Sequence, residues 1–260
     1  MMVTSADGVP IAYTVAGAGP SLVLLHGFSE AGESWQEAGY VDRLLQAGYQ
    51  VVLIDCRGHG GSGKPREPAA YSGDKRARDV IAVLDALGLP AADLAGFSMG
   101  GLIALATALR FPARVRRLVC IGAHPFAADM APYRLAVADG IERWVALHEG
   151  QGAPLTRDTR RRLLANDVAA LRACVAHDGR DMSPALAALR APLLAIAGTL
   201  DPIFTDVRAF AERVAGRFLA LEGRNHVTTF LAAEEIVAAI VRFLEGQPEA
   251  AAAVTQADIG

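Results

Sequence analysis

A serine flanked by glycines has the surroundings that best suit a nucleophile in this sequence. Ser98 stands within Gly96–Gly101, which reads GFSMGG. The segment 93–95 before it is typical of the end of an apolar strand, and 102–109 after it is rich in Leu, Ile and Ala, as a buried helix would be. A sharp strand-to-helix turn holds such a serine in a strained conformation that exposes its hydroxyl, and the glycines let the strand and the helix approach closely. The sequence therefore predicts an activated serine at a tight turn.

A serine nucleophile needs an imidazole to accept its proton and a carboxylate to orient that imidazole. His226, one of six histidines, follows the strand-like run 217–221 and a short loop. Asp201 follows the apolar run 192–198, which is typical of a strand buried on both faces. Because the carboxyl ends of parallel strands meet at one edge of a sheet, we expect Ser98, Asp201 and His226 to converge there.

The elements that must position these residues alternate along the chain. Strand-like runs cover 22–25, 50–54 and 115–121, and apolar residues at helical spacing predict a helix over 74–87 that ends at Gly88. Such alternation predicts an α/β fold, with a mostly parallel central sheet flanked by helices.

The alternation stops between residues 124 and 185, where helical segments occur without a convincing strand. We interpret 124–185 as a small helical cap inserted into a core formed by 1–123 and 186–246. We expect 247–260, which contains four consecutive alanines, to be a flexible tail.

These features together resemble the α/β-hydrolase superfamily, in the branch of small cap-bearing serine hydrolases that includes esterases and lactonases. The similarity runs from about Gly8 to Leu244. The motifs that carry it, in the expected order, are His26–Phe28, Asp55–Ser62, Gly96–Gly101, Gly198–Pro202 and Asn225–His226. By this resemblance Ser98 is the nucleophile, His226 the general base and Asp201 the carboxylate that holds the imidazole.

Attack on an ester carbonyl creates an oxyanion, which backbone N–H groups can stabilise in the transition state. One donor should be the amide of Met99, directly after the serine. The other should be the amide of Phe28, in the loop that follows the strand 22–25. The side chains of Phe28 and Met99 are then expected to shape the pocket.

Other residues are weaker candidates. Asp206 lies five residues beyond Asp201 and is expected to start a helix, so Asp201 is the preferred acid. For the substrate pocket the candidates are Trp35, His124, Tyr133 and Trp144, each with core packing as the alternative. The basic cluster Arg157 and Arg160–Arg162 is interpreted as a solvated helix face, with attraction of an anionic substrate as the alternative.

Composition excludes several classes of protein. The chain has 260 residues, 52% of them hydrophobic, and a formal net charge of −3, which gives no electrostatic reason to bind nucleic acid or an anionic membrane. The first residues lack the pattern of a signal peptide, and three scattered cysteines do not suit a disulfide framework. We therefore expect a cytoplasmic protein with no membrane partner.

The resemblance implies hydrolysis of a small, fairly apolar carboxylic ester or lactone through an acyl-enzyme on Ser98, with no metal or organic cofactor. Carbon–carbon bond hydrolysis and perhydrolysis by the same triad remain open, as does a ligand receptor that retains a slow triad. Epoxide and haloalkane chemistry in this superfamily usually depends on an aspartate at the position of Ser98, which argues against both.

Overall fold

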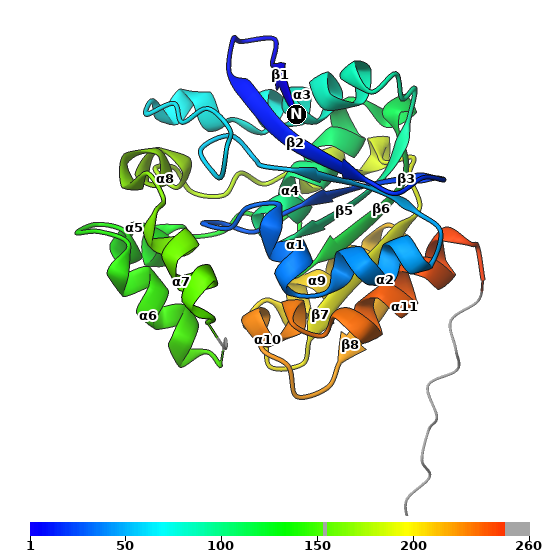
Figure 1. Cartoon of the computed structure of the whole chain (residues 1–260). Helices are drawn as coiled ribbons and strands as arrows, with labels where there is room; N and C mark the ends of the chain where they lie inside the picture. Colours follow the sequence, from blue (N-terminus) through cyan, green and yellow to red (C-terminus); the bar gives the residue numbers. More distant parts are fainter. Residues whose placement is uncertain (153–154, 248–260) are drawn as a thin grey trace, which may run out of the picture.

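The centre of the molecule is an eight-stranded sheet with the strand order β1-β2-β4-β3-β5-β6-β7-β8. It is seen in a computed structural model that describes residues 1–152 and 155–247 (Figure 1). β1 pairs antiparallel with β2, and β2 with β4, whereas all the other pairs are parallel. The strands are β1 (Met2–Thr4), β2 (Pro10–Ala16), β3 (Ser21–Leu25), β4 (Gln50–Ile54), β5 (Ala92–Phe97), β6 (Val115–Ile121), β7 (Leu193–Gly198) and β8 (Arg217–Leu221).

Helices connect these strands and cover both faces of the sheet. They are α1 (Glu33–Glu37), α2 (Tyr40–Gln46), α3 (Gly73–Ala86), α4 (Met99–Arg110), α5 (Ala131–Ala136), α6 (Glu142–Gly150), α7 (Arg157–Leu164), α8 (Val168–Cys174), α9 (Phe204–Arg213), α10 (His226–Phe230) and α11 (Ala233–Leu244). Short 3₁₀ turns cover Pro68–Tyr71, Pro112–Arg114 and Ser183–Ala188.

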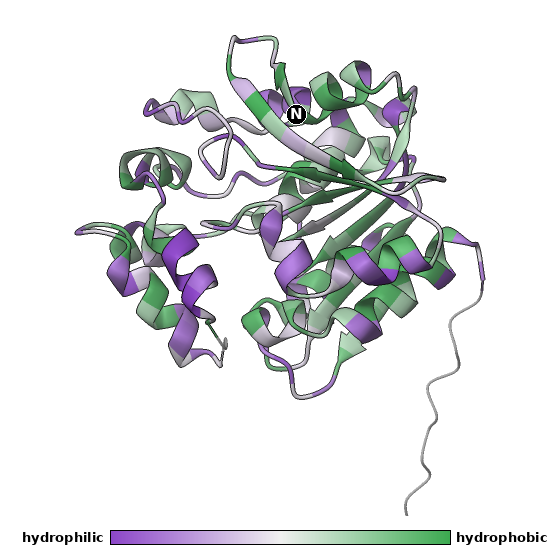
Figure 2. Cartoon of the chain, viewed as in Figure 1, coloured by the Kyte–Doolittle hydropathy of each residue, from purple (hydrophilic) through white to green (hydrophobic). Residues whose placement is uncertain are grey.

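The hydrophobic core has two layers, one on each face of the sheet. In β3, Val23 and Leu25 belong to the core layer that includes residues of α3, α4 and α9, whereas Leu22 and Leu24 belong to the layer that includes residues of α2 and α11. Successive side chains of a strand point to opposite faces, so a strand covered on both faces must be apolar throughout. Figure 2 shows the central strands as hydrophobic along their length.

The predicted fold class is confirmed by this sheet and its flanking helices. The runs 50–54, 115–121 and 217–221 coincide with β4, β6 and β8, and the helix predicted over 74–87 is α3. The antiparallel pair β1 and β2 was not predicted, because β1 has only three residues, none of them buried, and only two residues of β2 are buried.

The segment 124–185 contains α5, α6, α7 and α8, together with one isolated bridge between Ala128 and Gly179. These helices lie together to one side of the sheet (Figure 1). For the expected tail 247–260, only Gln247 is described, so the remainder of that prediction lies outside the described residues. Within the described ranges, no helix has the length and apolar character needed to cross a membrane.

A buried arginine ties the N-terminal hairpin to α3. The Arg57 guanidinium has no exposed surface and donates to both carboxylate oxygens of Asp79 at 2.6 Å, and also to Asp7 at 2.9 Å. Arg57→Met would leave the buried Asp79 carboxylate without its cation. We expect the free energy of unfolding to fall by about 3–5 kcal/mol, measured by chemical denaturation.

The matched control for this prediction is Arg78→Met, because Arg78 pairs with Asp74 on the solvent-exposed side of α3. Exposed ion pairs contribute little to stability, so this variant should leave the denaturation midpoint nearly unchanged. Equal losses of unfolding free energy in the two variants would contradict the prediction, because the buried Arg57–Asp79 pair would then contribute no more than an exposed pair.

Candidate active site

Ser98 occupies the predicted turn between β5 and α4. Its backbone has φ 52° and ψ −116°, and its N–H donates to the Ile121 carbonyl at 2.8 Å. A Cβ at Gly96 would lie 2.2 Å from the Gly100 oxygen, and a Cβ at Gly100 would lie 2.0 Å from the Leu25 oxygen. Only glycine fits at both positions, and a positive φ in a residue other than glycine marks stored strain. The GFSMGG sequence is therefore explained by the sterics of the turn.

Asp201 and His226 form a hydrogen-bonded pair at the carboxyl ends of β7 and β8. Asp201 Oδ2 lies 2.7 Å from His226 Nδ1, and Asp201 Oδ1 accepts from the Ile203 N–H at 3.1 Å. The Asp201 side chain is 1% exposed and that of His226 is 23% exposed. A carboxylate can only accept, so Nδ1 carries a proton and Nε2 of the neutral ring has a free lone pair. This is the tautomer that a general base requires.

The imidazole of His226 lies beside the turn that carries Ser98. A Cβ at Gly122 would approach His226 Cε1 to 2.9 Å, so the ring covers the end of β6. The ring also lies 5.0 Å from that of Phe97, the residue before Ser98. Among the described residues no hydrogen bond joins Ser98 Oγ to His226, and such contacts often tighten only when substrate binds.

The amides of Phe28 and Met99 are available as donors. In the part of the chain that the structure describes, the Phe28 N–H donates to no protein group, and Met99, as the first residue of α4, has no helical partner for its N–H. Unpaired backbone N–H groups are rare in folded proteins, and they are what an oxyanion hole needs.

Aromatic side chains from α5 and α6 pack over the Phe28 ring. The ring centroids of Tyr133 and Trp144 lie 5.7 Å and 5.2 Å from that of Phe28. His148, one turn after Trp144 on α6, lies 4.8 Å from it. Burial lowers the pKa of His148. The spacing of Trp144 and His148 places both on one face of α6. That spacing is the signal that could have identified His148 as a neighbour of Trp144 from the sequence.

Trp35 does not belong to this aromatic group, which corrects the expectation that it lines the substrate pocket. It has no exposed surface and packs in the core, with ring centroids 4.7 Å from Tyr40 and 5.0 Å from Phe230. Helix α1 turns this indole inward, where it packs against Tyr40 of α2.

His124 and the rival acid Asp206 lie together beyond the ends of β6 and β7. His124 is almost buried, and its Nδ1 accepts from the Phe126 N–H at 3.2 Å. Its Nε2 lies 3.8 Å from Asp206, whose side chain is 54% exposed. A role of His124 in the pocket stays a prediction, whereas the Asp201 contact to His226 favours Asp201 over Asp206 as the acid.

In the basic cluster on α7, Arg157, Arg160 and Arg161 are exposed as expected, whereas Arg162 is not. Arg162 is 14% exposed and donates to Glu30 at 2.7 Å and to Glu37 at 2.8 Å. Figure 2 shows α7 as a hydrophilic helix, and its Arg162 contacts α1 and the loop before it.

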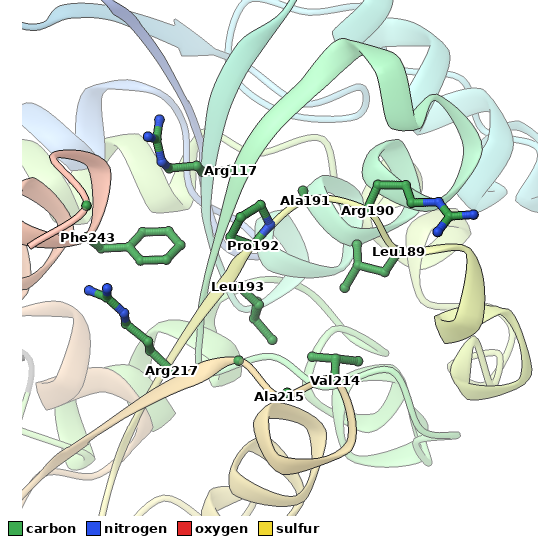
Figure 3. A pocket seen from close by; sticks show the side chains of 12 residues that line it. Arg117, Leu189, Arg190, Ala191, Pro192, Leu193, Val214, Ala215, Arg217 and Phe243 are labelled. Carbon is green, nitrogen blue, oxygen red and sulfur yellow. The ribbon is translucent and has the colours of Figure 1, made fainter. Parts of the chain in front are cut away.

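A separate groove of about 400 Å³ lies at the opposite edge of the sheet, at the amino ends of β7 and β8 (Figure 3). Arg117, Arg190 and Arg217 line it. The Arg217 guanidinium lies 5.6 Å from the Phe243 ring centroid and donates to the Gln247 carbonyl, and Arg117 lies 3.7 Å from Asp93. None of the residues Ser98, Asp201 and His226 lines this groove.

Known proteins resemble parts of this chain, and the match to a family model includes Ser98 but ends before Asp201 and His226. A protein-family model described as "alpha/beta hydrolase fold" matches residues 20–176. "Bifunctional epoxide hydrolase 2" of Mus musculus is 33% identical over 136 residues, covering 51% of this chain and 24% of that protein. The "2-hydroxy-6-oxononadienedioate/2-hydroxy-6-oxononatrienedioate hydrolase" of Paraburkholderia phymatum is 44% identical over 112 residues, covering 42% of this chain and 38% of that protein.

The likeness in structure extends further than the likeness in sequence. The enol-lactonase from Burkholderia xenovorans LB400 superposes with a TM-score of 0.81 at 25% identity, covering 94% of this chain and 100% of that one. The matched region spans well under two thirds of the Mus musculus and Paraburkholderia phymatum proteins. With the family model matching more than half of its length, the chain belongs to the alpha/beta hydrolase fold family.

Proposed function

We propose that this protein is a serine hydrolase that cleaves a small, fairly apolar carboxylic ester or lactone. The observation that carries the proposal is the Asp201–His226 pair, which lies at the same sheet edge as the strained Ser98 turn. Acyl transfer needs a nucleophile, a neutral imidazole with a free Nε2 and backbone donors for an oxyanion. Ser98, His226 and the amides of Phe28 and Met99 supply these groups.

The reaction proceeds in two halves. Ser98 Oγ attacks the carbonyl carbon while His226 Nε2 takes the hydroxyl proton, and the Phe28 and Met99 amides donate to the oxyanion. His226 then returns that proton to the leaving oxygen, which leaves an acyl group on Ser98. Water attacks this ester with His226 again as base, and the proton ends on Ser98 Oγ as the acid leaves.

The substrate class follows from the aromatic contacts of the Phe28 ring. Phe28, Tyr133 and Trp144 pack edge to face or at a tilt next to a proposed donor of the oxyanion hole, so an apolar acyl or ring group is expected there. The enol-lactonase likeness is consistent with a cyclic ester. Epoxide hydrolysis, the activity named for other relatives, is not expected here, because Ser98 stands where that chemistry usually relies on aspartate.

A second candidate is hydrolysis of a carbon–carbon bond by the same triad. It is favoured by the 44% identity to the Paraburkholderia phymatum hydrolase of an oxononadienedioate. Ester and carbon–carbon hydrolases share the serine, so the choice between them depends on which substrate turns over.

The test combines an ester series with covalent labelling. The purified protein is assayed on p-nitrophenyl esters from acetate to decanoate, and a fluorophosphonate adduct is located by peptide mass spectrometry. Turnover of esters with the adduct on Ser98 supports the proposal, and the preferred chain length measures the pocket. Turnover of an oxononadienedioate without turnover of esters or simple lactones favours the second candidate. Tight ligand binding without turnover of any substrate indicates a receptor.

A further inference from the structure

The loop that carries Phe28 contains a residue in an unfavourable backbone conformation. Ser29 has φ 66°, and the Glu30 N–H donates to the Gly27 carbonyl at 3.2 Å, which closes a tight turn over 27–30. A positive φ at the third residue of such a turn is the mark of type II and usually requires glycine or asparagine. A serine is strained in this position, and relief of the strain would move the residues on either side of it, Phe28 among them.

Residues of the segment 124–185 hold Ser29 in this conformation from two sides. Trp144 Nε1–H, on α6, donates to Ser29 Oγ at 2.6 Å. Asn166 Nδ2–H, just after α7, donates to the Ser29 carbonyl at 2.8 Å. Ser29 is 1% exposed, so water cannot easily replace either donor.

The next residue of the loop, Glu30, is bound to helix α7. Glu30 accepts from Arg162 at 2.7 Å and from the Ser34 hydroxyl, and Arg162 also binds Glu37 at 2.8 Å. These ion pairs connect α7 to the loop and to α1 through Arg162. Trp144 in addition packs its ring on that of Phe28.

We propose that Trp144 and Asn166 are positioning residues that keep the 27–30 turn in its strained form and so hold the Phe28 N–H toward the oxyanion. The helices of 124–185 then complete the oxyanion hole as well as covering the site. This inference rests on the proposed function, in which the Phe28 amide is one of the oxyanion donors. It predicts that damage to these contacts appears in kcat, because the donor acts mainly in the transition state.

The test uses Trp144→Phe, which removes the N–H donor and keeps an aromatic ring, and Asn166→Leu, which keeps the size of the side chain. Each variant should lose about tenfold in kcat. The double variant should approach the loss of about 10²- to 10³-fold that follows removal of one oxyanion donor, with a much smaller change in KM. Adding Ser29→Gly to the double variant should restore part of kcat, because glycine adopts a positive φ without external support.

The control is Arg66→Gln, which breaks another contact to the same segment, Arg66 to Asp167 at 3.0 Å, away from the 27–30 turn. Its kcat should be unchanged. The proposal is overturned if the folded double variant has wild-type kcat, whether KM is unchanged or raised. It is also overturned if adding Ser29→Gly to the double variant restores no kcat. Lack of any Ser98-dependent turnover in the unchanged protein overturns the proposed function itself, which separates the two failures.

Discussion

Replacing Ser98 with alanine should lower kcat for a p-nitrophenyl ester by about five to six orders of magnitude, as deletion of the nucleophile does in comparable triads. Without Oγ no acyl-enzyme forms, and His226 has no hydroxyl proton to accept. What remains is attack by water in a site that still contains the oxyanion donors, which is a far slower reaction. Wild type and variant are compared side by side in the same preparation and on the same ester.

The fold should tolerate Ser98→Ala, so the loss of kcat can be assigned to the missing nucleophile. Ser98 Oγ takes part in no hydrogen bond within the described ranges, and the thermal unfolding midpoint of Ser98→Ala should stay near that of wild type. Ser72→Ala is the matched control, because that hydroxyl only accepts from the Lys75 N–H at 3.4 Å at the start of α3. Retention of about a tenth of the activity in Ser98→Ala would show that another group is the nucleophile.

The parts of the site that depend on local backbone chemistry could be predicted from the sequence. Gly96 and Gly100 leave space that no other residue could leave, and a continuous apolar run such as 193–198 is required of a strand buried on both faces. These features place Ser98 and Asp201 at strand ends without knowledge of any distant contact. The meeting of Asp201 with His226 then follows from the parallel arrangement of β7 and β8.

The parts that depend on which helix faces meet could not be predicted in this way. Trp35 and Trp144 are both aromatic candidates for the substrate pocket, yet one lies in the core and the other on the Phe28 ring. Arg162 belongs to a basic run that is typical of a solvated face, and its burial depends on the distant Glu30 and Glu37. Ser29 gives no signal in the sequence, because its strain exists only once its partners are in place.

Asp201→Asn should lower kcat by about 10⁴-fold, the loss seen when the equivalent carboxylate of a serine triad becomes an amide. The structure explains which way the amide would turn. The Ile203 N–H now donates to Asp201 Oδ1, and in asparagine only the amide oxygen can accept that hydrogen bond. The amide oxygen therefore faces Ile203, and the amide NH₂ faces His226 Nδ1. Nδ1 must then accept, which moves the ring proton to Nε2 and removes the base that Ser98 needs.

The rival carboxylate provides the matched control for this prediction. Asp206→Asn changes an exposed side chain that lies 3.8 Å from His124 Nε2 and makes no hydrogen bond to His226 in the described structure. Its kcat should stay at the wild-type level. The two kcat values, measured on one ester at pH 7 to 9, decide between the acids. Loss in Asp206→Asn with activity kept in Asp201→Asn would transfer the role to Asp206. The opposite result assigns the orientation of His226 to Asp201, because both variants neutralise one carboxylate and only one of them reverses the hydrogen bond to Nδ1.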